Sequence, residues 1–281
     1  MLKIKNHIPN FITSLNIVSG ALSIIFAFEG LITLAAYMIL IAAVFDFLDG
    51  MMARLLKAYS EMGKQLDSLA DMVSFGLAPA IIAYHLMKPS IHIETLYPNN
   101  IEVYKLIYLF SVILIPIFSG LRLAKFNIDT RQTNNFIGLP TPANALFYAS
   151  IPIISSQNPF DPFLFLIFDK VNLLLIIITS SLLLVSPFHM FSFKFKNFKW
   201  SENKIRFIFL SLILVVIVLS ASQELKFIGS LITEMRILLL IKEFFYILVK
   251  ALPLIIILYI ILSLVNSSFT YFKRKQPSNS L

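Results

Sequence analysis

The chain has 281 residues, of which 58% are hydrophobic and 14% are charged, and its formal net charge is +8. Soluble domains average about 45–50% apolar and about 25% charged residues, so this composition excludes an ordinary soluble domain. The absence of cysteine excludes disulfides and thiolate metal sites. The basic residues lie in short segments between apolar runs, which favours a membrane protein that binds no nucleic acid.

Apolar runs long enough to cross a bilayer as helices follow one another along the chain. None alternates like a barrel strand, so the backbone hydrogen bonds inside the bilayer must form within helices. We predict an all-α polytopic membrane helical bundle of eight spans, with a six-helix core and two C-terminal spans. The predicted spans cover residues 11–28, 33–57, 64–86, 105–126, 141–157, 171–189, 206–222 and 244–267.

The predicted domains follow from these spans. They are a six-helix core at 1–190, a basic cytoplasmic loop at 191–205, a transmembrane pair at 206–270 and a polar tail at 271–281. The segment 226–242 is apolar but carries Lys226, Glu234, Arg236 and Lys242, so it suits an interfacial helix better than a ninth span.

Positive charge in the short connecting segments predicts the orientation. With a cytoplasmic N-terminus, eight spans place the basic residues of segments 3–5, 54–64, 122–131, 194–206 and 273–275 on the cytoplasmic side. A ninth span would move the last of these clusters outside. We therefore predict an integral multi-pass membrane protein with both termini cytoplasmic.

Four of the seven aspartates fall within residues 46–71, inside or beside apolar spans. Each charge at a helix centre costs about 2.5–3.5 kcal/mol on insertion scales. Asp46 and Asp49 are three residues apart, and Asp67 and Asp71 are four apart. Both intervals place two carboxylates on one helix face. The turn between the helices is short, so the two pairs are expected to face each other near the cytoplasmic end.

A cluster of carboxylate oxygens suits hard divalent cations such as Mg²⁺, Mn²⁺ or Ca²⁺. Two ions held together could clamp a phosphate diester during an in-line displacement. A proton or cation pathway, or helix ends that simply reach water, remain the alternatives.

Small residues accompany the aspartates. Gly50 and Ala53 follow Asp49 by one and four positions and leave space for a ligand, while Gly63 opens the third span. Close helix packing in the membrane is the alternative reason for such residues. Arg54 is the arginine within this run, and it could pair with a phosphate or with an aspartate.

Eight of these residues stand at fixed intervals: Asp46-x2-Asp49-Gly50-x2-Ala53-Arg54-x8-Gly63-x3-Asp67-x3-Asp71. The pattern resembles the motif of the CDP-alcohol phosphatidyltransferase family at every fixed position. The resemblance implies that Asp46, Asp49 and Asp67 bind metal and that Asp71 is both a ligand and the general base. It implies a nucleotide and phosphate site shaped by Gly50, Ala53, Arg54 and Gly63. It also implies Mg²⁺ or Mn²⁺, as two ions with Ca²⁺ a further option, and a homodimer.

The flanking segments resemble the branch of this family whose acceptor is serine. They are Pro9-Asn10-x2-Thr13-x2-Asn16-x3-Gly20 and residues 67–80, 122–127 and 136–143. The resemblance implies transfer of a phosphatidyl group from CDP-diacylglycerol to L-serine among membrane lipids at the cytoplasmic face. It makes phosphatidylserine and CMP the expected products. From the residues alone, each flank could equally cap, kink or end a helix.

Arg122 lies near the inner end of the fourth predicted span, where a guanidinium needs an anionic partner. We predict that Arg122 contacts a substrate phosphate or the serine carboxylate, with Lys125 as a second candidate. The alternative for both is a side chain that extends to the lipid headgroups.

Two rival functions stay open. The same chemistry could act on glycerol-3-phosphate, inositol phosphate or choline. From a different class, the aspartates could form the ion path of a cation-coupled transporter, although that role does not explain the spacing of Gly50, Ala53, Arg54 and Gly63.

Overall fold

A computed structural model describes residues 2–93, 102–128, 136–191, 200–231 and 237–275. These residues are helical almost throughout, so the prediction of an all-α polytopic bundle is confirmed. The chain divides into two units, residues 1–128 with 140–185 and residues 129–139 with 186–281. The predicted domain boundaries at 190, 205 and 270 stay predictions.

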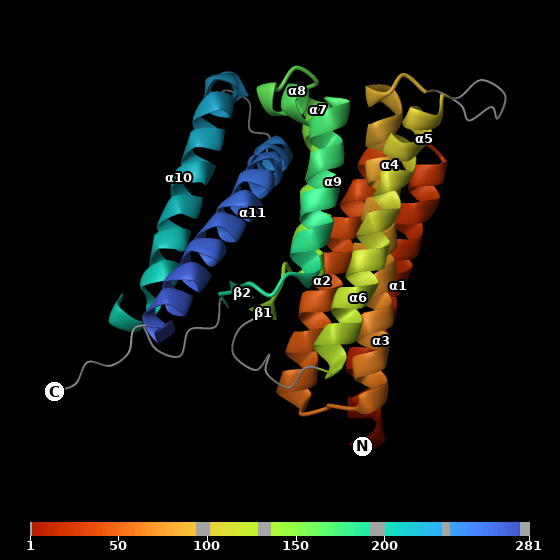
Figure 1. The fold of residues 1–281 in the computed structure, drawn as a ribbon, viewed down its shortest axis with the longest axis vertical. Coiled ribbons are helices and arrows are strands. Elements are labelled where there is room, and N and C mark those ends of the chain that lie inside the picture. Colours follow the sequence, from red (N-terminus) through yellow and green to blue (C-terminus); the bar gives the residue numbers. More distant parts are fainter. Residues whose placement is uncertain (1, 94–101, 129–135, 192–199, 232–236, 276–281) are drawn as a thin grey trace. The chain divides into compact units, whose positions relative to one another are not determined.

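The first unit is a bundle of long helices that lie side by side (Figure 1). Two helical stretches change type along their length, through the π-helical segment η1 and the 3₁₀ segment η2. In chain order the elements are α1 (Leu2–Phe28), α2 (Ile32–Leu56), α3 (Glu61–Asp71), η1 (Met72–Leu77), α4 (Ala78–Ser90), α5 (Val103–Phe110), η2 (Ser111–Ile113), α6 (Leu114–Ile128), α7 (Thr141–Gln157), α8 (Pro162–Ile167) and α9 (Lys170–Val185).

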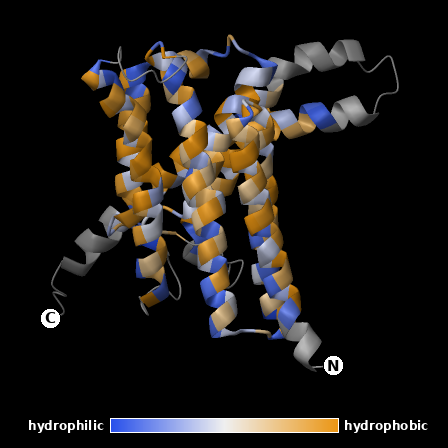
Figure 2. Cartoon of the chain, turned by 90° about the vertical axis from the view of Figure 1, so that its right-hand side faces the viewer, coloured by the Kyte–Doolittle hydropathy of each residue, from blue (hydrophilic) through white to orange (hydrophobic). Residues whose placement is uncertain are grey.

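Within the described residues, six helices are long and apolar enough to cross a membrane. They are His7–Phe28, Ile32–Leu56, Glu61–Ser90, Val103–Ile128, Asn203–Ala221 and Lys242–Ser267. Figure 2 shows hydrophobic residues along the middle of the helices and more hydrophilic residues toward their ends. The other two predicted spans correspond to α7 and α9, which have 17 and 16 residues. At a rise of about 1.5 Å per residue both are shorter than the bilayer core of about 30 Å, so the total of eight spans stays a prediction.

A tight turn reverses the chain between α2 and α3. Lys57 adopts a left-handed conformation with φ of 51°, and its amide donates to the carbonyl of Arg54 at 3.3 Å. Ser60 begins α3, because its side-chain oxygen accepts a hydrogen bond from the amide of Gly63 at 3.0 Å. The turn therefore occupies residues 57–60, and Gly63 lies in the first turn of α3.

Helix α1 packs against both α2 and α3, whereas α2 and α3 themselves approach each other closely at few positions. The contact of α1 with η1 is the tightest. A Cβ atom on Gly20 would lie 2.8 Å from the Cα atom of Ser74, so only glycine fits there. The hydroxyl of Ser74 donates to the carbonyl of Asn16 at 2.9 Å. These contacts fix α1 against the stretch that follows Asp71.

The second unit contains a small antiparallel ribbon and two long helices. Strand β1 (Phe136–Ile137) pairs with β2 (His189–Met190), and the helices are α10 (Trp200–Leu231) and α11 (Ile237–Lys275). Phe191 packs against Phe209 and Tyr259, with ring centroids 5.4 and 5.0 Å apart. The hydroxyl of Tyr259 also donates to the carbonyl of Phe191 at 3.2 Å.

The predicted basic loop, interfacial helix and polar tail all fall in the C-terminal part of the chain, which the structure describes only in part. The predicted basic loop falls mainly on residues 192–199, which lie outside the described residues. In the predicted interfacial segment 226–242, residues 226–231 are the end of α10 and residues 237–242 are the start of α11. Residues 232–236 lie outside the described residues. Helix α11 continues through Lys275, and most of the predicted tail at 271–281 lies outside the described residues.

Candidate active site

Three of the four aspartates come together between α2 and α3. Asp46, Asp49 and Asp67 each offer a carboxylate oxygen, and these three oxygens lie within 4.8 Å of one another. Asp49 is buried, and the other two are partly buried. Asp46 and Asp49 share one face of α2 because they are three residues apart, and the turn at residues 57–60 brings Asp67 back toward that face.

Asp71 lies one helical turn deeper than Asp67, at the last position of α3. It does not belong to the three-carboxylate cluster, but its carboxyl group interacts electrostatically with Asp46 and Asp67. Its side chain is 9% exposed. One buried oxygen of Asp71, and one of Asp49, lacks a hydrogen-bond partner.

This donor set fits a divalent metal ion. Several carboxylates held close together in a membrane bundle repel one another, and a buried ionised group without a partner costs several kcal/mol. A hard cation would bind the unpaired oxygens of Asp49 and Asp71 and remove the repulsion. The arrangement of Asp46, Asp49, Asp67 and Asp71 therefore suits a hard divalent cation.

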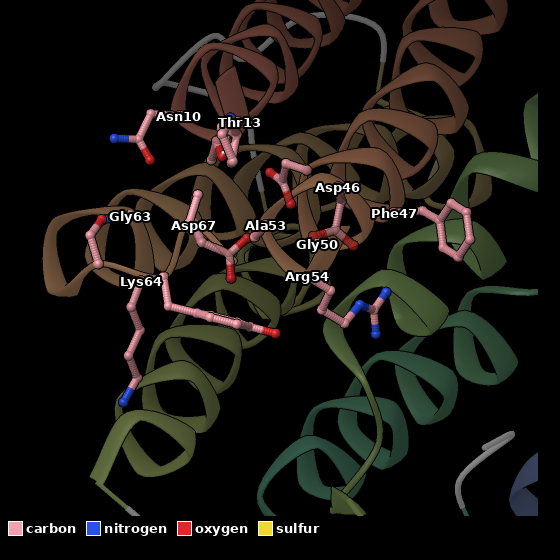
Figure 3. A pocket seen from close by; sticks show the side chains of 15 residues that line it. Asn10, Thr13, Asp46, Phe47, Gly50, Ala53, Arg54, Gly63, Lys64 and Asp67 are labelled. Carbon is pink, nitrogen blue, oxygen red and sulfur yellow. Dashed lines mark hydrogen bonds between the residues drawn. The ribbon is translucent and has the colours of Figure 1, made fainter. Parts of the chain in front are cut away.

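A cavity of about 470 Å³ opens beside the aspartates (Figure 3). Its walls come from α1, from α2, from the turn that follows α2 and from α3. They consist of Pro9, Asn10, Thr13, Asp46, Phe47, Asp49, Gly50, Ala53, Arg54, Ala58, Tyr59, Ser60, Gly63, Lys64 and Asp67. In this view Arg54 and Lys64 extend on opposite sides of the acidic group. The cavity is therefore lined by a cluster of aspartates together with two cationic side chains, Arg54 and Lys64.

The two glycines beside the cavity have different surroundings. A Cβ atom on Gly50 would meet nothing within 4 Å, so this residue leaves open space next to Asp49. A Cβ atom on Gly63 would lie 2.9 Å from the side-chain oxygen of Asn10, so this residue allows α1 and α3 to approach closely. Ala53 and Arg54 also line the cavity, and Arg54 is exposed.

Arg122 and Lys125 do not line this cavity. Arg122 is 7% exposed, its Nη1 atom donates to the hydroxyl of Thr141 at 3.3 Å, and it interacts electrostatically with Asp71. It is therefore buried behind Asp71 and does not extend to the headgroups. Lys125 is exposed, as expected for a side chain that reaches the membrane surface.

Sequence reasoning assigned no site role to several residues of the cavity, above all Thr13 and Lys64. The Thr13 hydroxyl lies beside the Asp49 carboxylate. Lys64 donates to the main-chain carbonyl of Asn127 at 2.9 Å, and the Asn127 side chain donates to Ser68 at 2.8 Å. The spacing Pro9-Asn10-x2-Thr13 was a usable sign for α1, whereas nothing in the local sequence marks Lys64.

Comparison with known proteins agrees with this geometry. The family model for CDP-alcohol phosphatidyltransferase matches residues 6–228. The chain is 39% identical over 137 residues to the CDP-diacylglycerol–serine O-phosphatidyltransferase of Bacillus subtilis, covering 49% of this chain and 70% of that protein. It is 37% identical over 155 residues to the protein of that name from Saccharomyces cerevisiae, covering 48% of this chain and 50% of the yeast protein.

A third relative is the archaetidylserine synthase of Methanothermobacter thermautotrophicus, which is 37% identical over 145 residues. That match covers 51% of this chain and 56% of the archaeal protein. The chain thus matches about half the length of the yeast and archaeal proteins and 70% of the Bacillus protein. Because the family model covers most of the sequence, the chain belongs to the CDP-alcohol phosphatidyltransferase family.

Proposed function

We propose that this protein is an integral-membrane transferase that moves a phosphatidyl group from CDP-diacylglycerol to L-serine, giving phosphatidylserine and CMP. The observation that carries the proposal is the convergence of Asp46, Asp49 and Asp67 at the base of a cavity, with buried Asp71 one turn deeper. The names of the relatives support serine as the acceptor, because serine is common to them while the lipid differs.

The cavity has the properties that a CDP-activated lipid requires. Arg54 and Lys64 offer positive charge to the phosphates of the nucleotide, and the open space beside Gly50 leaves room for it. We assign Asp46, Asp49, Asp67 and Asp71 as ligands of two Mg²⁺ or Mn²⁺ ions, with Ca²⁺ as a further option. When bound, such ions neutralise charge on the pyrophosphate and on the departing nucleotide.

In the proposed reaction, Asp71 accepts the proton of the serine hydroxyl. The serine oxygen then forms a bond to the phosphorus that carries the diacylglycerol, while the bond from that phosphorus to the bridging oxygen breaks and CMP leaves. Burial of Asp71 keeps bulk water away from this proton transfer. Arg122 stands behind Asp71 and is proposed to attract the acceptor's carboxylate.

The rival functions make different predictions. Another acceptor alcohol would use the same aspartates and differ only in which alcohol supports CMP release. A cation-coupled transporter would move ions across sealed vesicles without cleaving CDP-diacylglycerol. Membership of a transferase family and a cavity that joins the aspartates to Arg54 and Lys64 favour the transferase.

The main experiment measures CMP release by purified protein supplied with CDP-diacylglycerol and Mn²⁺ or Mg²⁺. We expect release with L-serine and little with glycerol-3-phosphate, inositol phosphate or choline. Excess chelator should abolish the activity, and added metal should restore it. Full activity in chelator would contradict the metal assignment, and preference for another alcohol would replace serine as the acceptor.

A second experiment replaces the proposed base. Asp71→Asn keeps the size of the side chain but removes the proton acceptor, so turnover should fall by at least about 100-fold. The variant should still elute from size-exclusion chromatography as the wild type does, since asparagine keeps the shape of the side chain and its neutral amide relieves the repulsion from Asp46 and Asp67. Near-normal turnover of the folded variant would show that another group accepts the proton.

The orientation and the homodimer are further parts of the proposal. The cavity lies at the end of the first unit that carries Pro9 and the basic turn at Lys57, and the positive charge there favours the cytoplasmic face. Because the chain lacks cysteine, Lys57→Cys provides a unique thiol. A membrane-impermeant maleimide should label Lys57→Cys only in permeabilised cells. The same reagent should label Leu31→Cys, at the opposite end of α2, in intact cells. The reverse labelling pattern would show that the orientation is inverted.

The homodimer is tested by light scattering of the detergent-solubilised protein, which should give twice the mass of one chain.

A further inference from the structure

Three buried polar side chains on helices that contact η1 carry side-chain atoms without a hydrogen-bond partner, and they have no role in the reaction described so far. They are Asn16 on α1, Ser119 on α6 and Asn144 on α7, each at most 1% exposed. Both polar atoms of the Asn16 amide lack a hydrogen bond, as do the amide nitrogen of Asn144 and the hydroxyl of Ser119. A buried polar group left unpaired costs about 1–3 kcal/mol, so such groups call for a specific explanation.

Asn16 is the residue of α1 that contacts the segment after Asp71 through a hydrogen bond from Ser74. It stands one helical turn beyond Thr13, on the face of α1 that lines the cavity. Its main-chain carbonyl accepts a hydrogen bond from Ser74, which is three residues beyond Asp71. Asn16 therefore lies one turn along α1 from the cavity wall, at the contact of α1 with η1.

The other two groups belong to helices that pack against the same segment. η1 contacts α1, α6 and α7. A Cβ atom on Gly76 of η1 would lie 3.4 Å from the Cβ atom of Ser119. Asn144 follows Thr141 by three residues on α7, and Thr141 accepts a hydrogen bond from Arg122. The three helices that carry these unpaired groups thus all pack against η1, the segment that follows Asp71.

We propose that Asn16, with Asn144, binds the acceptor and that the site selects a small zwitterionic amino acid. This inference rests on the proposed function and names the residues that recognise its second substrate. The carboxylate of the ligand accepts hydrogen bonds from the amide nitrogens, and its ammonium group donates to the Asn16 oxygen. Ligand binding then provides the partners that the buried amides lack.

Charge supports an amino acid over a phosphorylated alcohol. Among the residues named for this site, Arg122 carries the one positive charge, and the amides and hydroxyl are neutral. One guanidinium balances one carboxylate. A phosphate monoester carries about 1.5 to 2 negative charges at neutral pH, which is more than the single guanidinium of Arg122 balances.

The test uses Asn16→Leu, which removes the amide and keeps a similar volume. We expect the KM for serine to rise about tenfold or more, corresponding to the loss of a hydrogen bond to a charged group, while the KM for CDP-diacylglycerol stays near the wild-type value. The melting temperature of the ligand-free protein should stay the same or rise, because an unpaired buried amide is removed. Asn16→Ala should raise the KM for serine in the same way and serves if the leucine variant does not fold.

Ser23→Ala is the matched control. Ser23 is also on α1 and fully buried, but its hydroxyl donates to the carbonyl of Ala35 at 2.8 Å. This variant should leave the KM for serine unchanged. An unchanged KM for serine in the folded Asn16 variants would overturn the inference and make the amide a packing residue. A wild-type protein that releases no CMP with serine would instead refute the proposed function itself, so the two failures are distinguishable.

Discussion

Mutual repulsion among buried carboxylates is the constraint on which the active end of this bundle depends. Three aspartate oxygens lie within 4.8 Å of one another, and a fourth carboxyl group is buried one turn deeper. Apolar helices alone would gain nothing from such an arrangement, because each charge lowers the stability of a membrane-embedded helix. A bound cation would turn this repulsion into attraction, and the same charge would serve the pyrophosphate of the proposed substrate.

The rest of the first unit supports that cluster. Helix α1 packs against both α2 and α3 and forms a wall of the cavity between them. Glycines allow the close contacts on which this depends, with Gly63 against Asn10 and Gly20 against Ser74. Gly50 has the opposite role and keeps space open beside Asp49. One residue type thus serves both tight packing and substrate access, depending on its neighbours.

Much of this could be predicted from the sequence, because the relevant information is local. Apolar run length gave the bundle, and intervals of three and four residues placed the aspartates on facing surfaces. The total number of spans was harder, since α7 and α9 are shorter than a typical span. The last predicted span, 244–267, agrees with the apolar stretch Lys242–Ser267 of α11, which continues as a helix through Lys275.

The remaining features depend on contacts between distant segments. Lys64 is held by Asn127, and Arg122 lies beside Asp71 and Thr141, pairings that no interval within one helix reveals. The π-helical turn after Asp71 also has no clear local signature, although it sets which residues of α1 and α6 meet that helix. The unpaired amide of Asn16 becomes visible only when its burial and its neighbours are known together.

Binding of Mn²⁺ to the purified protein tests the central claim most directly. Electron paramagnetic resonance of free Mn²⁺ during a titration measures this binding without any catalytic turnover. The wild-type protein should bind Mn²⁺ saturably, and Asp67→Asn should weaken that binding at least about tenfold, since it removes one carboxylate ligand. Equal binding by the two proteins, or no saturable binding by the wild type, would contradict the account.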